Sequence, residues 1–115
     1  MQYRRLGSSG LQISALSFGA WVTFGNQVDR SAARELLACA YDHGVNFFDN
    51  AETYAAGEAE RVMGDALADL RFPRDSWCVS SKVYFGSVRD PSPTQHGLSR
   101  KHVMDACHQA LKRLR

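Results

Sequence analysis

The stretch Val45-Asn46-Phe47-Phe48-Asp49-Asn50-Ala51-Glu52-Thr53-Tyr54 decides which fold this chain can adopt. Its apolar half ends on the carboxylate of Asp49, and a tyrosine follows five residues later. A second apolar run, Trp77 to Val83, carries Lys82 near its end. Short apolar runs that alternate with helical segments are typical of parallel strands in an α/β fold. Because the carboxyl ends of such strands share one edge, we expect Asp49, Tyr54 and Lys82 to converge there.

These three side chains suit the reduction of a carbonyl group. A phenol has an unperturbed pKa of about 10, and a cation within about 4–6 Å stabilises the phenolate. Tyr54 beside Lys82 is therefore expected to donate a proton. A carboxylate such as Asp49 would keep the lysine charged and oriented in a pocket that excludes water. Each residue alone has an ordinary structural interpretation, as a turn cap, a packed loop residue or a solvated strand end. The three in this order favour a catalytic site.

Extended segments recur along the chain. Residues 2–6 and 11–14 flank Gly7-Ser8-Ser9-Gly10, a strong turn signal, and predict a β-hairpin. The expected parallel strands are residues 16–20, 45–49 and 77–83. Gly19 permits a close approach of the backbone at the end of the first of them. The strand-helix period of about thirty residues equals the size of a βαβ unit.

Three helices are expected between and after these strands. Asp29 or Ser31 can cap the first helix, and Gly44 ends it. The second is expected from about Glu58 to Leu70, and the third after Ser99. Each has one apolar stripe at helical spacing. The stripes are Ala33, Leu36, Leu37, Ala40 and Tyr41; Val62, Met63, Ala66, Leu67 and Leu70; and Val103, Ala106, Cys107, Ala110, Leu111 and Leu114.

The motifs of this sequence resemble those of the aldo-keto reductases. Val45 to Glu60 and Ser80 to Val83 carry the general resemblance. Three further stretches are most similar to the branch that contains the voltage-gated potassium channel beta subunits and their bacterial relatives: Gly19 to Gly25, Asp49 to Gly57 and Gly97 to His102. The resemblance implies an α/β fold that is the N-terminal portion of a (β/α)8 TIM barrel. Residues 1–14 would be a hairpin plug, and residues 15–115 the first three βα units of a single partial domain.

The resemblance also implies an activity, the NADPH-dependent reduction of aldehydes and ketones. Asp49, Tyr54 and Lys82 match three members of the family's Asp-Tyr-Lys-His tetrad. The fourth is expected on the next strand, past Arg115, because none of the four histidines (His43, His96, His102 and His108) stands at that place.

The implied cofactor-binding residues lie on the same rim. They are Gly19, Ala20, Trp21, Gln27 and Asp49. Ala20 and Trp21 would approach the nicotinamide-ribose part of NADPH, with Gln27 nearby, and Asp49 would contact the ribose. The long connection 84–98 leaves the strand that carries Lys82, so it is expected to border the site.

Composition and charge exclude several other classes. A formal net charge of +2 gives no reason to expect nucleic acid, and the basic residues near the end are interpreted as a solvated helix face: Arg100, Lys101, Lys112, Arg113 and Arg115.

Three cysteines, an odd number (Cys39, Cys78 and Cys107), indicate reduced core thiols in a cytoplasmic protein, without the ligand spacing of a zinc site. No apolar run reaches the roughly 18 residues of a membrane span. No Rossmann or P-loop motif is present.

Three functional interpretations stay open at this stage. The first is the N-terminal part of a reductase that acts on a small-molecule carbonyl substrate. The second is a regulatory subunit of a membrane channel that binds a nicotinamide cofactor and turns over slowly. The third is a truncated chain without activity, because a complete barrel of about 250 residues is about twice as long as this chain of 115 residues. An open parallel edge is expected to favour self-association into homo-oligomers.

Overall fold

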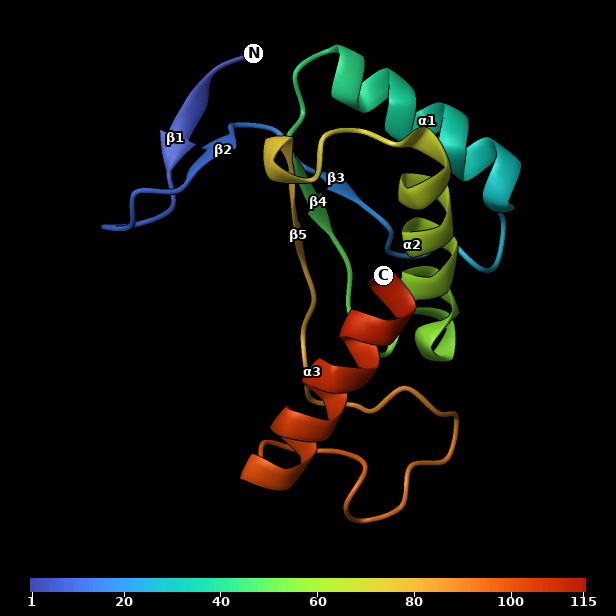
Figure 1. The fold of residues 1–115 in the computed structure, drawn as a ribbon. Coiled ribbons are helices and arrows are strands. Elements are labelled where there is room, and N and C mark those ends of the chain that lie inside the picture. Colours follow the sequence, from blue (N-terminus) through green and yellow to red (C-terminus); the bar gives the residue numbers. More distant parts are fainter.

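A computed structural model describes all 115 residues and has an α/β architecture (Figure 1). The strands are β1 (Tyr3–Arg5), β2 (Gln12–Ser14), β3 (Phe18–Gly19), β4 (Phe47–Asp49) and β5 (Cys78–Ser80). The helices are α1 (Arg30–Asp42), α2 (Glu58–Leu70) and α3 (Arg100–Leu114), and the short 3-10 turns are η1 (Tyr54–Gly57) and η2 (Arg74–Ser76). Strands β1 and β2 pair antiparallel, whereas β3, β4 and β5 form a parallel sheet in that order.

The register of the parallel sheet brings the strand ends level with one another. Asp49 lies opposite Gly19 on one side and Ser80 on the other. The chains stay aligned beyond the strands, because the N–H of Glu52 donates to the carbonyl of Lys82 at 3.1 Å. Strand β5 is shorter than the strand expected over residues 77–83. The residues that follow it nevertheless stay beside the segment that follows β4.

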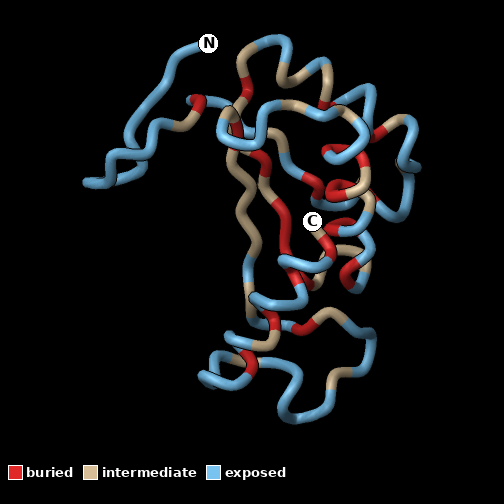
Figure 2. Tube along the Cα trace, viewed as in Figure 1, coloured by how far each residue is buried: buried red, intermediate tan, exposed pale blue.

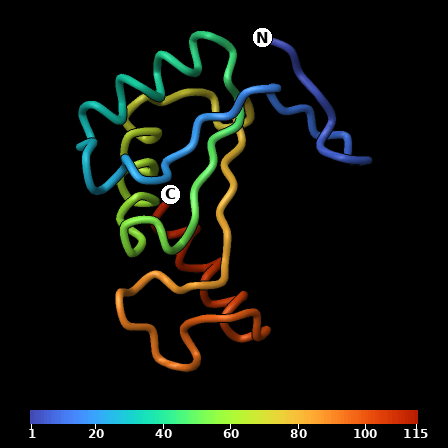
Figure 3. The backbone as a smooth tube through the Cα atoms, turned by 180° about the vertical axis from the view of Figure 1, so that it is seen from behind, coloured from blue at the N-terminus to red at the C-terminus, as the bar shows by residue number.

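Helices α1 and α2 pack side by side against this sheet (Figures 1 and 3). The core between them is centred on Phe48 of β4, whose ring meets Trp77 edge to face at a centroid distance of 6.2 Å. Leu37 of α1 and Met63 of α2 are fully buried against it. Figure 2 shows the buried residues gathered along β4 and the inner sides of the two helices. The apolar stripes of the first two helices thus face the sheet, although Leu36 lies at the edge of its stripe and is exposed.

The hairpin lies at the amino end of the sheet, away from the strand ends that carry Asp49 and Lys82 (Figure 1). The N–H of Ser14 donates to Oδ1 of Asn46 at 2.7 Å, directly before β4. The hydroxyl of Tyr3 donates to the carbonyl of Gly44 at 2.9 Å, at the end of α1. These contacts fix the hairpin to the start of the second parallel strand.

Helix α3 departs from its expected packing. Ala106 and Ala110 are buried, but Leu111 in the same stripe is 65% exposed. Arg113 was expected on a solvated basic face, and that prediction is wrong, since its side chain is only 7% exposed. Its Nε donates to Oε2 of Glu60 at 2.5 Å, and that carboxylate on α2 is fully buried. The buried ion pair brings α3 onto α2.

Two smaller expectations are also settled by the structure. Asp29, rather than Ser31, caps α1 and accepts a hydrogen bond from the N–H of Ala32 at 2.9 Å. The prediction that the three cysteines are core thiols is wrong, because Cys39 and Cys107 are exposed and Cys78 is only partly buried; all three are free. None of the helices is both long and apolar enough to cross a membrane.

Gly64 marks the closest approach of α2 and α3, and we predict that Gly64→Ala destabilises the protein. The added Cβ would lie 2.3 Å from the carbonyl oxygen of Arg113 and 2.8 Å from the Cα of Leu114. Alanine favours a helix by about 0.5–1 kcal/mol over glycine, whereas overpacking against a backbone costs about 1–3 kcal/mol, so a net loss is expected. Urea unfolding measures it. The control is Gly10→Ala, whose added Cβ meets nothing within 4 Å; equal stability of the two variants would contradict the close crossing.

Candidate active site

Asp49 and Lys82 meet at the carboxyl end of the parallel sheet. The Lys82 Nζ donates to Oδ2 of Asp49 at 2.7 Å and to the carbonyl of Asn50 at 2.6 Å. The hydroxyl of Ser80 donates to the other carboxylate oxygen of Asp49 at 2.6 Å. The register of β4 and β5 creates this arrangement, because it places Ser80 opposite Asp49 and the lysine two residues further on. Both oxygens of the carboxylate are thereby held, and the ammonium is aimed by two acceptors.

The surroundings of Lys82 keep it charged. Partial burial by itself would lower the pKa of its ammonium, but the hydrogen bond to Asp49 and the neighbouring phenol of Tyr54 outweigh that effect, and the pKa is raised above its ordinary value. Stability that depends on this ammonium is therefore fully present at neutral pH and is lost only as the pH rises through the raised pKa.

Tyr54 lies directly beside the lysine. The Lys82 Nζ sits over the face of its ring, 4.9 Å from the ring centroid, in the range of a cation–π interaction. The ring also stacks on Trp21, with centroids 6.3 Å apart and planes at 23°. A cavity of about 530 Å³ opens here, lined by apolar side chains that include Trp21, Tyr54 and Phe85. The structure thus brings the three expected catalytic residues to one place, next to an aromatic cavity.

A strained turn holds Tyr54. Ala55 (φ 49°, ψ 38°) and Ala56 (φ 53°, ψ 44°) both adopt the left-handed region, and Gly57 follows with φ 87°. This conformation costs an L-residue roughly 1–2 kcal/mol. The fully buried Asn50 braces the turn, since its Nδ2 donates to the carbonyl of Ala59 at 3.1 Å and its Oδ1 accepts from the N–H of Ala51 at 2.9 Å.

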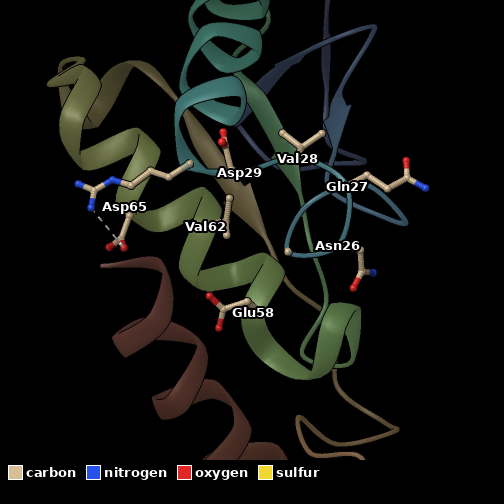
Figure 4. Close-up of a pocket in the computed structure, with 9 residues that line it drawn as sticks. Asn26, Gln27, Val28, Asp29, Glu58, Val62 and Asp65 are labelled. Carbon is tan, nitrogen blue, oxygen red and sulfur yellow. Dashed lines mark ion pairs between the residues drawn. The ribbon is translucent and has the colours of Figure 1, made fainter.

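The implied cofactor-binding residues are divided between the rim and other places. Gly19 ends β3 with open space around it, and Trp21 is 70% exposed at the rim. The methyl group of Ala20 is fully buried in the core instead of facing the rim. Gln27 lines a separate cavity of about 460 Å³ between residues 25–30 and α2 (Figure 4).

That second cavity has an acidic wall. Figure 4 shows Asp29, Glu58 and Asp65 around it, with Asp65 paired to Arg30 at 3.8 Å. Its carboxylates would repel the phosphates of a dinucleotide. Gln27 thus lies on the acidic cavity and not on the Trp21–Tyr54 cavity, although Asn26 lines both of them.

The chain is similar to known proteins along nearly its whole length. The family described as the aldo/keto reductase family matches residues 15–115. The chain belongs to the aldo/keto reductase family. It is 54% identical over 114 residues to a "Probable voltage-gated potassium channel subunit beta" of Arabidopsis thaliana, and 53% identical to a protein of the same description from Oryza sativa subsp. japonica. In both comparisons 99% of this chain and 34% of the relative are covered. The chain spans about a third of the length of these curated relatives.

Several residues of this aldo/keto reductase chain were not expected at the site. Asn50 and Ser80 orient the Asp49–Lys82 pair, and the buried Glu52 binds His102 of α3 through its Oε1, which lies 3.1 Å from Nε2. The position of Glu52, between Asp49 and Tyr54 in the stretch that follows an apolar strand, was an available signal. No signal in the sequence pointed to His102, because it lies beside the apolar stripe of its helix and its partner, Glu52, is 50 residues away along the chain.

We predict that Ala55→Gly and Ala56→Gly each stabilise the protein by about 0.5–1 kcal/mol, because glycine adopts the left-handed region without the Cβ penalty. Chemical denaturation measures the change. The matched control is Ala38→Gly within α1, which is expected to lose about 0.5–1 kcal/mol because glycine disfavours a regular helix. Destabilisation in all three variants would show that the turn carries no strain.

Proposed function

We propose that this protein catalyses the NADPH-dependent reduction of aldehydes or ketones, with Tyr54 as the proton donor. The observation that carries the proposal is the Lys82 ammonium, hydrogen-bonded to Asp49 at 2.7 Å and lying 4.9 Å from the centroid of the Tyr54 ring. Family membership supports an oxidoreductase role.

Each of the three residues has a distinct task in this proposal. Tyr54 donates its hydroxyl proton to the carbonyl oxygen of the substrate as negative charge develops there. Lys82 stabilises the phenolate that remains, because a cation close to the ring favours its charged form. Asp49 keeps the ammonium charged and oriented, and Ser80 and the Asn50 carbonyl fix that orientation. Preorganised charges of this kind need no rearrangement during the reaction.

The rim residues fit a nicotinamide ring. Trp21 offers an exposed aromatic face, and Gly19 leaves open space at the end of β3, so that a flat ring can approach the backbone there. Asp49 is the polar group at this rim that would contact the ribose. The cofactor, when bound, would supply the hydride. The residues of this chain would bind and orient the cofactor, and Tyr54 would supply the proton.

We propose further that β3, β4 and β5 are the first three strands of a (β/α)8 barrel and that the hairpin closes its amino-terminal end. The parallel order of the strands and the place of the hairpin support this arrangement. Residues 1–14 would then be the plug, and residues 15–115 part of a single barrel domain that acts in the cytoplasm on small carbonyl compounds. Homo-oligomers are proposed only for a chain in which no further strand pairs with the outer edge of β5, because an unpaired strand edge favours self-association.

We predict that Tyr54→Phe, in the protein expressed from its complete reading frame, lowers kcat for aldehyde reduction by about 10²–10⁴-fold. The substitution removes the proton donor and keeps the ring that stacks on Trp21, so the Kd for NADPH is expected to stay within about threefold. Steady-state kinetics and a fluorescence titration of NADPH measure the two effects.

Tyr41→Phe is the control for this experiment. It removes a hydroxyl that is bonded to Ser76 at 2.7 Å, far from the sheet end, and should leave kcat unchanged. Less than a tenfold loss in Tyr54→Phe would show that another group donates the proton.

A second candidate function is regulation of a membrane channel, and the description of the plant relatives favours it. In that case the protein would bind a nicotinamide cofactor and turn over slowly. The identity of the fourth tetrad residue discriminates the two, since histidine would polarise the carbonyl and favour efficient reduction, whereas asparagine would favour the regulatory role. Sequencing the complete reading frame identifies that residue, and it also tests the third possibility, a truncated chain without activity.

A further inference from the structure

The connection from β5 to α3 is fastened by one buried carboxylate. Glu52 is 2% exposed, and its Oε1 accepts hydrogen bonds from the N–H of Tyr84 at 2.7 Å and of Gly86 at 2.9 Å. The same oxygen lies 3.1 Å from Nε2 of His102, which is 5% exposed in the first turn of α3. A carboxylate in this position accepts only, so the imidazole nitrogen donates.

The loop closes on itself around this point. The N–H of Gly97 donates to the carbonyl of Tyr84 at 2.6 Å. Gly86 has φ 86°, and a Cβ on it would lie 2.5 Å from the carbonyl oxygen of Gln95. The hydroxyl of Ser99 caps α3 by accepting from the N–H of His102 at 3.1 Å. Both ends of the loop therefore converge on Glu52, while its middle extends beyond the end of the sheet (Figure 1).

Phe85 stands between the two N–H groups that Glu52 binds. Its side chain is 65% exposed and lines the cavity that also contains Trp21 and Tyr54. Two hydrogen bonds to one buried oxygen, from the residues on either side, fix its backbone. Phe85 is thus held over the cavity through the carboxylate of Glu52. Neither Glu52 nor its partner His102 lines the cavity.

We propose that the Glu52–His102 pair is a specificity-determining pair that positions Phe85 as a wall of the substrate cavity. This inference rests on the proposed reductase function. The pair acts through the loop and touches no reacting atom, so both members are positioning residues. Its effect is greatest for a carbonyl compound whose flat apolar group contacts the Phe85 ring, and least for a substrate too small to reach that ring.

The test uses the protein expressed from its complete reading frame, NADPH and two substrates, 2-naphthaldehyde and propanal. Glu52→Ala is expected to raise KM for 2-naphthaldehyde about tenfold, and to change KM for propanal and both kcat values by no more than about threefold. Glu52→Gln keeps an acceptor oxygen for the two N–H groups and should restore most of the difference. His102→Ala leaves those two hydrogen bonds in place and should shift the KM ratio in the same direction by a smaller factor.

A Phe85→Ala background separates positioning from general destabilisation. If Glu52 acts through Phe85, adding Glu52→Ala to Phe85→Ala leaves the KM ratio unchanged. The control is Tyr41→Phe, which removes a hydroxyl bonded to Ser76, away from the loop, and should leave the ratio at its wild-type value. An equal rise of KM for both aldehydes, or an additive effect in the Phe85→Ala background, would overturn the proposal.

Failure of the proposed function is recognised separately. If the wild-type protein reduces neither aldehyde, the reductase function fails and the specificity proposal with it. Amide hydrogen exchange still tests the anchoring of the loop, because the amides of Tyr84 and Gly86 should exchange slowly in the wild type and at least about tenfold faster in Glu52→Ala. Unchanged exchange would show that Glu52 does not hold the loop.

Discussion

The parallel register of β3, β4 and β5 is the constraint on which the rest of the site depends. It sets Asp49 level with Gly19 and Ser80 and brings Lys82 alongside the chain that leaves β4. A shift of one residue in a strand would turn its side chains to the opposite face, and the lysine would then point toward the helices. The burial of Phe48 opposes such a shift, because its ring fills the space between the sheet and the helices. The packing of the core thus fixes the geometry of the polar groups at the sheet end.

Two buried carboxylates extend this control to the segments around Lys82. Glu60 accepts from the hydroxyl of Ser81 at 2.6 Å, on one side of the lysine, and pairs with Arg113 of α3. Glu52 binds backbone N–H groups on the other side and His102 of the same helix. Removing one partner of the buried Glu60–Arg113 ion pair would leave an uncompensated charge at a cost of about 3–5 kcal/mol. Both carboxylates therefore hold the same helix and the same stretch of chain, and Lys82 lies between their anchor points.

Local patterns predicted the elements well and their polar contacts poorly. The apolar runs, the turn signal at Gly7 to Gly10 and the caps at Asp29 and Ser99 are short-range features, and they indicated the order of strands and helices. Glu60 and Arg113 are different, because each continues an apolar stripe as a charged residue and finds its partner 53 residues away. The charge of Arg113 favoured a solvated position, and only the packing of α3 on α2 turns it inward and pairs it with Glu60. The left-handed alanines after Tyr54 carry no sequence signal, since alanine is most often helical.

Geometry alone does not give the Lys82 cation its full effect on Tyr54. The side chains of Lys82 and Asp49 are 49% and 36% exposed, so water screens both of them. Two unit charges 4 Å apart interact by about 1 kcal/mol in bulk water and about 4 kcal/mol at an effective dielectric constant of 20. The Lys82 ammonium, kept charged by Asp49, therefore favours a phenolate on Tyr54 more strongly once water is excluded from the open face of the sheet. Because strands and hydrogen bonds already fix the positions of Asp49 and Lys82, covering that face strengthens their electrostatic interactions without any rearrangement of these side chains.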